Sequence, residues 1–153
     1  MMVEKYERDT MNIMLADDDA DDRMFFEEAL SSTPIKFNLT LFKDGFELMD
    51  YFSNPESELP HILFLDLNMP GKSGIQCLEE LRAIPRLREM SVAIYSTSSA
   101  DRDIEDTLSK GANIYIQKPS NFEKLRKVIS HVLKTNWQFH MSGLNKETFF
   151  LNI

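Results

Sequence analysis

The sequence contains very little cysteine. Cys77 is the single thiol in 153 residues, and one thiol can neither form an intramolecular disulfide nor supply a thiolate metal site by itself. The three histidines do not cluster with it or with one another, and we interpret each as a structural or surface residue: His61, His131 and His140. A thiolate or imidazole metal centre is therefore not expected.

Positive charge and long apolar runs are also scarce. The chain has 17 basic against 25 acidic residues, for a formal net charge of −8, which argues against binding nucleic acid through phosphate contacts. No apolar run approaches the roughly 18 residues of a membrane span, and the leader MMVEKYERDT does not have the pattern of a secretory signal. We therefore expect a cytoplasmic protein that engages no nucleic acid and no membrane.

Short apolar runs alternate with amphipathic stretches along the chain. The runs predict strands at 12–16, 37–42, 61–65, 92–95 and 113–116. The amphipathic stretches predict helices, each opened by a capping residue: Asp19, Asp44, Ser73, Ser98 and Ser120. In the helix after Asp44, we expect Phe46, Leu48, Met49 and Phe52 to face the core. Alternating strands and helices predict an α/β fold, a doubly wound five-stranded parallel sheet with helices on both faces.

The chain divides into three segments. Residues 1–10 form a polar leader, residues 11–134 hold the predicted domain, and residues 135–153 form a short C-terminal extension rich in aromatic residues. The extension is too apolar to be ignored and too short for an output domain. Two interpretations are equally open: it folds back on its own domain, or it covers a partner or a second copy of the chain.

Carboxylates follow two of the predicted strands, where ligands bind in folds of this class. Asp17 and Asp18 follow the first strand and Asp66 follows the third, while Ser96 and Lys118 follow the fourth and fifth. Crowded carboxylates repel one another unless a cation neutralises them, and oxygen ligands favour Mg²⁺ over zinc. Next to them, we interpret Asp21 and Asp22 only as solvated charges at a helix start.

Four motifs at these strand ends carry a resemblance to a known family. They are ADDD at 16–19, LDLNMPGKSG at 65–74, YSTS at 95–98 and YIQKP at 115–119. With these motifs, the chain resembles a receiver domain of the two-component response regulators, of the single-domain, chemotaxis type. The resemblance covers about residues 12–133 and implies a flavodoxin-like fold.

The resemblance implies a phosphoacceptor and a metal site. Asp66 matches the family's phosphoacceptor. Asp18 matches a direct Mg²⁺ ligand, Asp17 a water-mediated one, and the backbone carbonyl of Asn68 completes the set with Asp66. The side chains of Asn68 and Ser98 occupy positions that set the lifetime of the acyl phosphate.

The resemblance also implies a switch. Ser96 matches the switch hydroxyl, with Thr97 as the alternative, and Lys118 matches the lysine that contacts the acyl phosphate. Tyr115 matches the aromatic residue whose orientation tracks activation, although by default it would be a core aromatic. The Lys118–Pro119 peptide bond is often cis in this family.

The expected function is a stand-alone switch with no separate output domain. A sensor histidine kinase or a histidine phosphotransfer protein would donate the phosphoryl group, and an unknown downstream protein would bind the result; a homodimer is a further candidate assembly. The chain would be no enzyme beyond its own phosphotransfer and dephosphorylation. One alternative is an aspartyl-phosphate hydrolase, which usually needs an acid where Asn68 stands. Another is a degenerate receiver that only binds partners.

Overall fold

The computed structural model describes residues 10–135 and 150–151. Five strands lie close to the predicted ranges: β1 Met11–Ala16, β2 Phe37–Phe42, β3 Ile62–Leu65, β4 Val92–Ser96 and β5 Ile114–Gln117. The helices between and after them are α2 Ala20–Ser31, α3 Gly45–Ser53, α4 Gly74–Ala83, α5 Asp101–Ser109 and α6 Phe122–Lys134. A short 3₁₀ helix, η1 at Pro85–Leu87, was not predicted. The predicted doubly wound α/β architecture is confirmed.

All strand pairs in the sheet are parallel, and the strand order is β2-β1-β3-β4-β5-β6. The chain runs outward from β1 to β2 and then crosses to β3 on the other side of β1, so the order reverses between β1 and β3. In sheets of this type, a crevice opens at such a reversal, at the carboxyl ends of the strands.

The sixth strand, β6 at Phe150–Leu151, comes from the C-terminal extension. It pairs with β5 in the register Tyr115↔Phe150 and Ile116↔Leu151, so these two residues fold back on the domain's own sheet. The sequence predicted five strands because two residues are too short a run to show a period. The leader up to residue 9 and most of the extension, at 136–149 and 152–153, lie outside the described residues.

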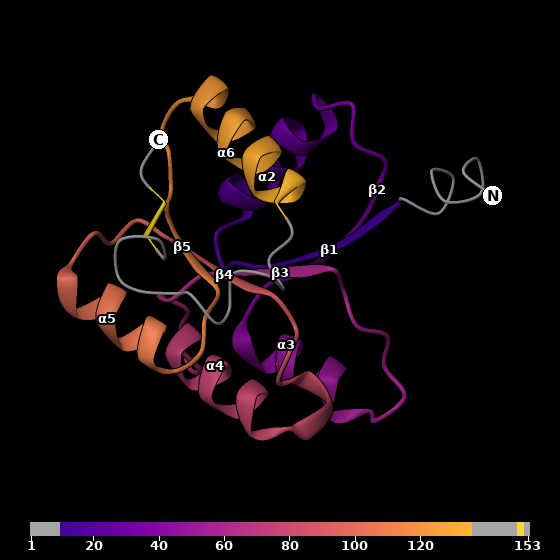
Figure 1. The fold of residues 1–153 in the computed structure, drawn as a ribbon, viewed down its shortest axis with the longest axis vertical. Coiled ribbons are helices and arrows are strands. Elements are labelled where there is room, and N and C mark those ends of the chain that lie inside the picture. Colours follow the sequence, from indigo (N-terminus) through magenta and orange to yellow (C-terminus); the bar gives the residue numbers. More distant parts are fainter. Residues whose placement is uncertain (1–9, 136–149, 152–153) are drawn as a thin grey trace.

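Helices cover both faces of the sheet (Figure 1). One face carries α2 and α6, which pack together over a core that includes Ile13, Phe64 and Ile129. The other face carries α3, α4 and α5 over a second core that includes Leu48 and Tyr115. The β3 strand is buried along its whole length between the two layers, as a central parallel strand requires. In the described part of the chain, no helix is both long and apolar enough to cross a membrane.

The prediction for Phe46 is wrong. Its side chain is 57% exposed, whereas Gly45, Leu48 and Phe52 form the buried face of α3. Residues 45, 48 and 52 follow helical spacing, and position 46 lies about 100° around the helix from position 45. The ring of Phe46 instead lies over Gly71, where an added Cβ would come within 2.6 Å of Phe46 Cε2.

Two of the five predicted helix caps are also wrong. Asp19, Asp44 and Ser73 accept backbone hydrogen bonds at the starts of α2, α3 and α4 as predicted. For α5, the N-cap is Ala100 rather than Ser98, because the Ser98 hydroxyl accepts from Ala100 N and donates to Asp103. For α6, the cap is Asn121, one residue after the predicted Ser120.

Candidate functional site

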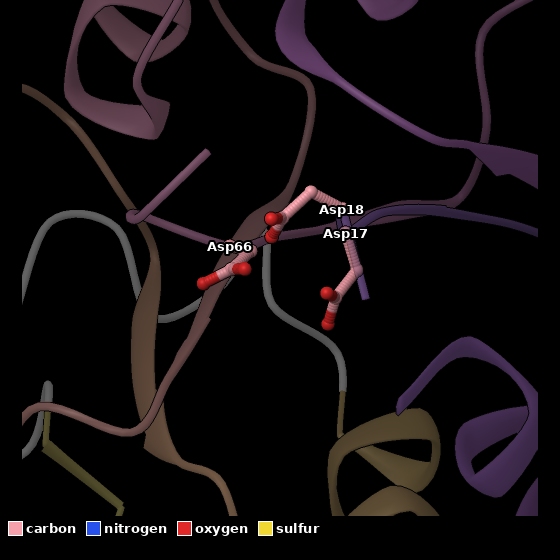
Figure 2. Close-up of side chains that lie close together, drawn as sticks. All are labelled: Asp17, Asp18 and Asp66. Carbon is pink, nitrogen blue, oxygen red and sulfur yellow. The ribbon is translucent and has the colours of Figure 1, made fainter. Parts of the chain in front are cut away.

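Three carboxylates converge at the carboxyl ends of β1 and β3 (Figure 2). One oxygen from each of Asp17, Asp18 and Asp66 lies within 4.8 Å of the others. The cause is the sheet itself: Ala16 pairs with Leu65, so the residues that follow these two strands come out side by side. Asp17 and Asp66 are buried, while Asp18 is exposed. The expected cluster of carboxylates is therefore present, with one of them facing solvent.

Asp66 is held by its own backbone and by the loop after it. Its N–H donates to the Ala16 carbonyl at 3.0 Å, and its Oδ1 accepts from Asn68 N at 3.3 Å. Burial raises the pKa of Asp66 to about 7; the Lys118 ammonium opposes this shift, and the Asp17 carboxylate adds to it. A buried carboxyl with neighbouring carboxylates keeps its proton more strongly than an exposed one.

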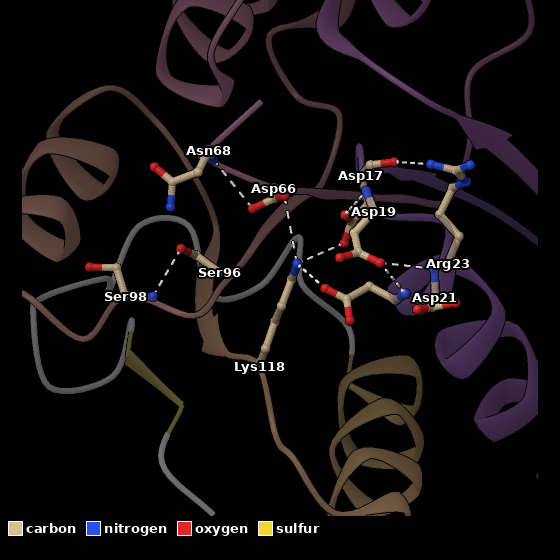
Figure 3. Close-up of polar contacts among 10 residues, drawn as sticks. Asp17, Asp19, Asp21, Arg23, Asp66, Asn68, Ser96, Ser98 and Lys118 are labelled. Atoms are coloured by element: carbon tan, nitrogen blue, oxygen red, sulfur yellow. Dashed lines mark hydrogen bonds and ion pairs between the residues drawn. The ribbon is translucent and has the colours of Figure 1, made fainter. Parts of the chain in front are cut away.

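Lys118 brings the only described ammonium to this cluster. Its Nζ lies 2.8 Å from Asp17 Oδ2 and 3.6 Å from Asp66 Oδ2. Figure 3 draws these contacts as dashed lines. It also lies 5.3 Å from the centroid of the Tyr95 ring, a favourable cation–π arrangement. Burial alone lowers the pKa of Lys118, but hydrogen bonds to carboxylates outweigh that effect and raise it above its ordinary value. The neighbouring carboxylates therefore favour the charged form of this side chain.

Asp22 belongs to this group, contrary to the sequence interpretation. Its Oδ2 lies 2.8 Å from Lys118 Nζ, so Asp22 is more than a solvated charge at the start of α2. The two residues are 96 positions apart, and no local pattern indicates that the first turn of α2 reaches the end of β5. Asp21, its neighbour in the same turn, is exposed, as expected for a solvated charge at the start of a helix.

The hydroxyl at the end of β4 belongs to a small hydrogen-bond network. Ser96 is fully buried and its Oγ accepts from Ser98 N at 3.1 Å, whereas Thr97 is exposed. The Tyr115 hydroxyl donates to the Ser98 carbonyl at 2.9 Å, and the Ser98 hydroxyl donates to Asp103 Oδ2 at 2.6 Å. Ser98 thus connects the buried serine, the buried tyrosine and helix α5.

Asn68 and Pro119 occupy the loops after β3 and β5. Asn68 is exposed, and its N–H holds Asp66 as described above. The Lys118–Pro119 bond is often cis in the family that the chain resembles, but no peptide bond among the described residues is cis. For an X–Pro bond, the trans form is more stable than the cis form by only about 0.5–1 kcal/mol. The contacts around the bond therefore decide which of the two forms is present.

The donor set fits a hard divalent cation. It consists of carboxylate oxygens, which suit Mg²⁺ or Mn²⁺ rather than zinc. Asp17 Oδ2 is buried, and its close polar neighbour is the Lys118 ammonium at 2.8 Å. Three carboxylates beside a single ammonium leave an excess of negative charge that a bound cation would neutralise.

The fold and this acidic site define a response regulator receiver domain. The family model of that name matches residues 13–130, and the chain belongs to this family. The fold resemblance and the family expected from the four motifs are both confirmed.

The relatives include small regulators of similar length. The response regulator Rcp1 of a Synechocystis species is 27% identical over 124 residues, which are 78% of this chain and 84% of Rcp1. The probable methanogenesis regulatory protein FilR2 of Methanothrix harundinacea is 28% identical over 132 residues, 84% of each chain. The match therefore extends over most of each relative.

Solved structures agree with this assignment. The Mn²⁺-bound form of Rcp1 superposes with a TM-score of 0.75 at 27% identity, over 82% of this chain and 96% of that one. The phosphorylated cyanobacterial phytochrome response regulator RcpA gives 0.74 at 28% identity, over 80% and 91%. Relatives of this chain have thus been observed both with a divalent metal and in a phosphorylated form.

Proposed function

We propose that the chain is a signalling switch that accepts a phosphoryl group on Asp66 from a phosphohistidine of a sensor histidine kinase or a histidine phosphotransfer protein. The observation that carries the proposal is the geometry around Asp66. A buried carboxylate lies beside two further carboxylates and 3.6 Å from a buried ammonium. Membership of the receiver family supports the same reaction.

In the proposed reaction, an oxygen of the ionised Asp66 carboxylate attacks phosphorus, and the P–N bond to the donor imidazole breaks with its electrons going to the imidazole. The product is an acyl phosphate. Phosphoryl transfer depends mainly on positioning and charge compensation, and two contacts position Asp66: its N–H to Ala16 and its Oδ1 to Asn68 N. Water then hydrolyses the acyl phosphate, which regenerates the Asp66 carboxylate and releases inorganic phosphate. The chain would therefore catalyse only its own phosphorylation and dephosphorylation.

Asp17, Asp18 and Asp66 would hold the Mg²⁺ ion, with the Asn68 carbonyl as a fourth protein oxygen. When bound, the ion would neutralise the carboxylates and the charge of the incoming phosphoryl oxygens. The Lys118 ammonium, 3.6 Å from Asp66 Oδ2, would stabilise the charge that the phosphoryl group adds. Its close contact with Asp17 holds it at the edge of the site before transfer.

The switch in this proposal runs through Ser98. If Ser96 turns its hydroxyl toward a phosphoryl oxygen, its Oγ no longer accepts from Ser98 N. Ser98 also holds the Tyr115 hydroxyl and Asp103 of α5, so a shift of this residue changes the surface around α5 and β5. Side chains at Asn68 and Ser98 would tune the lifetime of the acyl phosphate by admitting or excluding water. A downstream protein, or a second copy of the chain in a homodimer, would bind the changed surface.

The proposal is tested with a small phosphodonor. Acetyl phosphate with Mg²⁺ should give a phosphorylated form that is seen by intact-protein mass spectrometry and is removed by hydroxylamine, as an acyl phosphate requires. Asp66→Asn should abolish it, and Asp50→Asn, which removes an exposed carboxylate from α3, should not. Unchanged phosphorylation of Asp66→Asn would exclude Asp66 as the acceptor.

A further inference from the structure

The three carboxylates around Lys118 differ in how they meet solvent. Lys118 Nζ lies 2.8 Å from Asp17 Oδ2, 2.8 Å from Asp22 Oδ2 and 3.6 Å from Asp66 Oδ2. The side chains of Asp17 and Asp66 are 0% and 5% exposed, whereas that of Asp22 is 38% exposed. Asp22 is therefore the solvent-facing partner of an ammonium that is otherwise buried.

The position of Asp22 is fixed by the start of α2. Asp19 caps this helix, and its Oδ1 accepts from the backbone N–H groups of both Asp21 and Asp22. The turn is thereby held so that Asp22 reaches the end of β5. Among the described residues, the ion-pair partners of Lys118 are Asp17, Asp22 and Asp66. Asp21 shares the same turn and cap but is not one of them.

The ammonium is shared among acceptors at different distances. Lys118 Nζ donates a hydrogen bond to Asp22 Oδ2 at 2.8 Å, whereas Asp66 Oδ2 lies 3.6 Å away. A phosphoryl oxygen on Asp66 would compete with these carboxylates for the same ammonium. Asp22 loses its partner at the lowest cost, because water reaches its carboxylate, whereas an unpaired charge on buried Asp17 would be expensive.

We propose that Asp22 is a positioning residue for Lys118, which holds the ammonium in the unphosphorylated protein and releases it when a phosphoryl group is added to Asp66. The inference rests on the proposed function and assigns a role within it. Since the contact exists only before transfer, it stabilises the unphosphorylated state alone. Removing it must therefore shift the equilibrium toward the phosphoryl-bound state.

The experiment is a titration with beryllofluoride, a phosphoryl mimic, in saturating Mg²⁺. We expect Asp22→Asn to bind it about two- to fivefold more tightly than the unmodified protein, the range for a partly exposed ion pair. Asp21→Asn is the matched control: it removes the same charge from the same helix turn, and its affinity should be unchanged. Raising the salt concentration should reduce the difference in beryllofluoride affinity between Asp22→Asn and the unmodified protein, because salt screens an exposed ion pair. A difference in affinity that salt does not reduce counts against the inference.

Each remaining outcome decides the question. If Asp22→Asn binds the mimic as Asp21→Asn does, or more weakly than the unmodified protein, the inference is overturned. If the unmodified protein and Asp66→Asn bind it equally, the acceptor assignment fails, and this inference fails with it. Melting temperatures in EDTA show whether each variant is folded. If Asp22→Asn does not fold, Asp22→Ser is tested in its place.

Discussion

Gly74 lies directly against the backbone carbonyl of Asp66. A Cβ at position 74 would come 2.1 Å from Asp66 O and 2.7 Å from Leu67 Cα, and Gly74 N already donates to the Leu67 carbonyl at 2.9 Å. The start of α4 and the residue proposed to accept the phosphoryl group are therefore in contact through backbone atoms alone. Neither backbone can yield easily, because Asp66 is also tied to β1 through Ala16.

The first prediction follows from this contact. Gly74→Ala should destabilise the protein by about 1–3 kcal/mol, the usual cost of overpacking, and should displace Asp66. Urea unfolding measures the loss of stability. Titration with beryllofluoride measures the displacement of Asp66, as a loss of affinity for this phosphoryl mimic.

The matched comparison for Gly74→Ala is Gly111→Ala. Gly111 has a φ of 97°, so alanine there costs about 1–2 kcal/mol through the backbone. The nearest atoms to an added Cβ belong to the Arg82 side chain and not to the backbone around Asp66. The Gly111→Ala variant should therefore be less stable than the unmodified protein but should bind beryllofluoride with the same affinity. Equal losses of affinity in the two variants would contradict a specific role for Gly74.

The second prediction concerns pH. The pKa of Asp66 is raised to about 7 in the folded protein, chiefly by burial, so between about pH 4 and 7 the folded state binds a proton that the unfolded state has lost. Stability contributed by this group is therefore present at low pH and falls as pH rises, by at most about 1.4 kcal/mol per pH unit.

This contribution is isolated with Asp66→Asn, which cannot titrate. In EDTA, the free energy of unfolding of Asp66→Asn should rise relative to the unmodified protein between pH 4 and 7 and level off above that. Asp50→Asn, which removes an exposed carboxylate outside the acidic cluster, is the control variant. A flat difference for Asp66→Asn would mean that the folded protein does not raise the pKa of Asp66.

Much of the fold could be predicted because its signals are local. The apolar run 61–65 and the strands around it indicate a parallel sheet by themselves, and strand ends in such a sheet place Asp17, Asp18, Asp66 and Lys118 near one another. Asp22 could not be predicted, because its contact with Lys118 depends on how α2 is oriented over the sheet. The prediction for Phe46 is wrong because the four residues expected to face the core, at positions 46, 48, 49 and 52 of the nine-residue helix α3, do not all lie on one face of the helix.

The third prediction concerns metal binding. Asp18 is the exposed member of the acidic cluster, so Asp18→Asn should leave stability in EDTA unchanged or raise it slightly by relieving repulsion. Mg²⁺ at a hundredfold excess over its Kd should stabilise the unmodified protein by about 2.7 kcal/mol, seen as a rise in melting temperature. Asp18→Asn should lose most of this rise and Asp21→Asn should keep it. A full rise in Asp18→Asn would remove Asp18 from the ligand set.

The last prediction concerns the polar connector at 54–60, which follows α3 and is held by the Arg86 side chain of η1. Its guanidinium donates to the carbonyls of Phe52, Asn54 and Ser57 and to the Ser57 hydroxyl, at 2.8 to 3.2 Å. A lysine offers three donors on one atom and cannot reproduce this fork. Arg86→Lys should lower stability by about 1–2 kcal/mol and speed hydrogen exchange at residues 54–60.

Arg88→Lys is the matched control for this variant, since Arg88 is exposed just beyond η1, and it should change neither quantity. The connector contributes no residue to the acidic cluster, so Arg86→Lys should bind beryllofluoride as the unmodified protein does. Faster exchange in both variants would mean that the connector is held by something other than the Arg86 fork. A loss of beryllofluoride affinity in Arg86→Lys alone would instead show that the connector helps to hold the site in place.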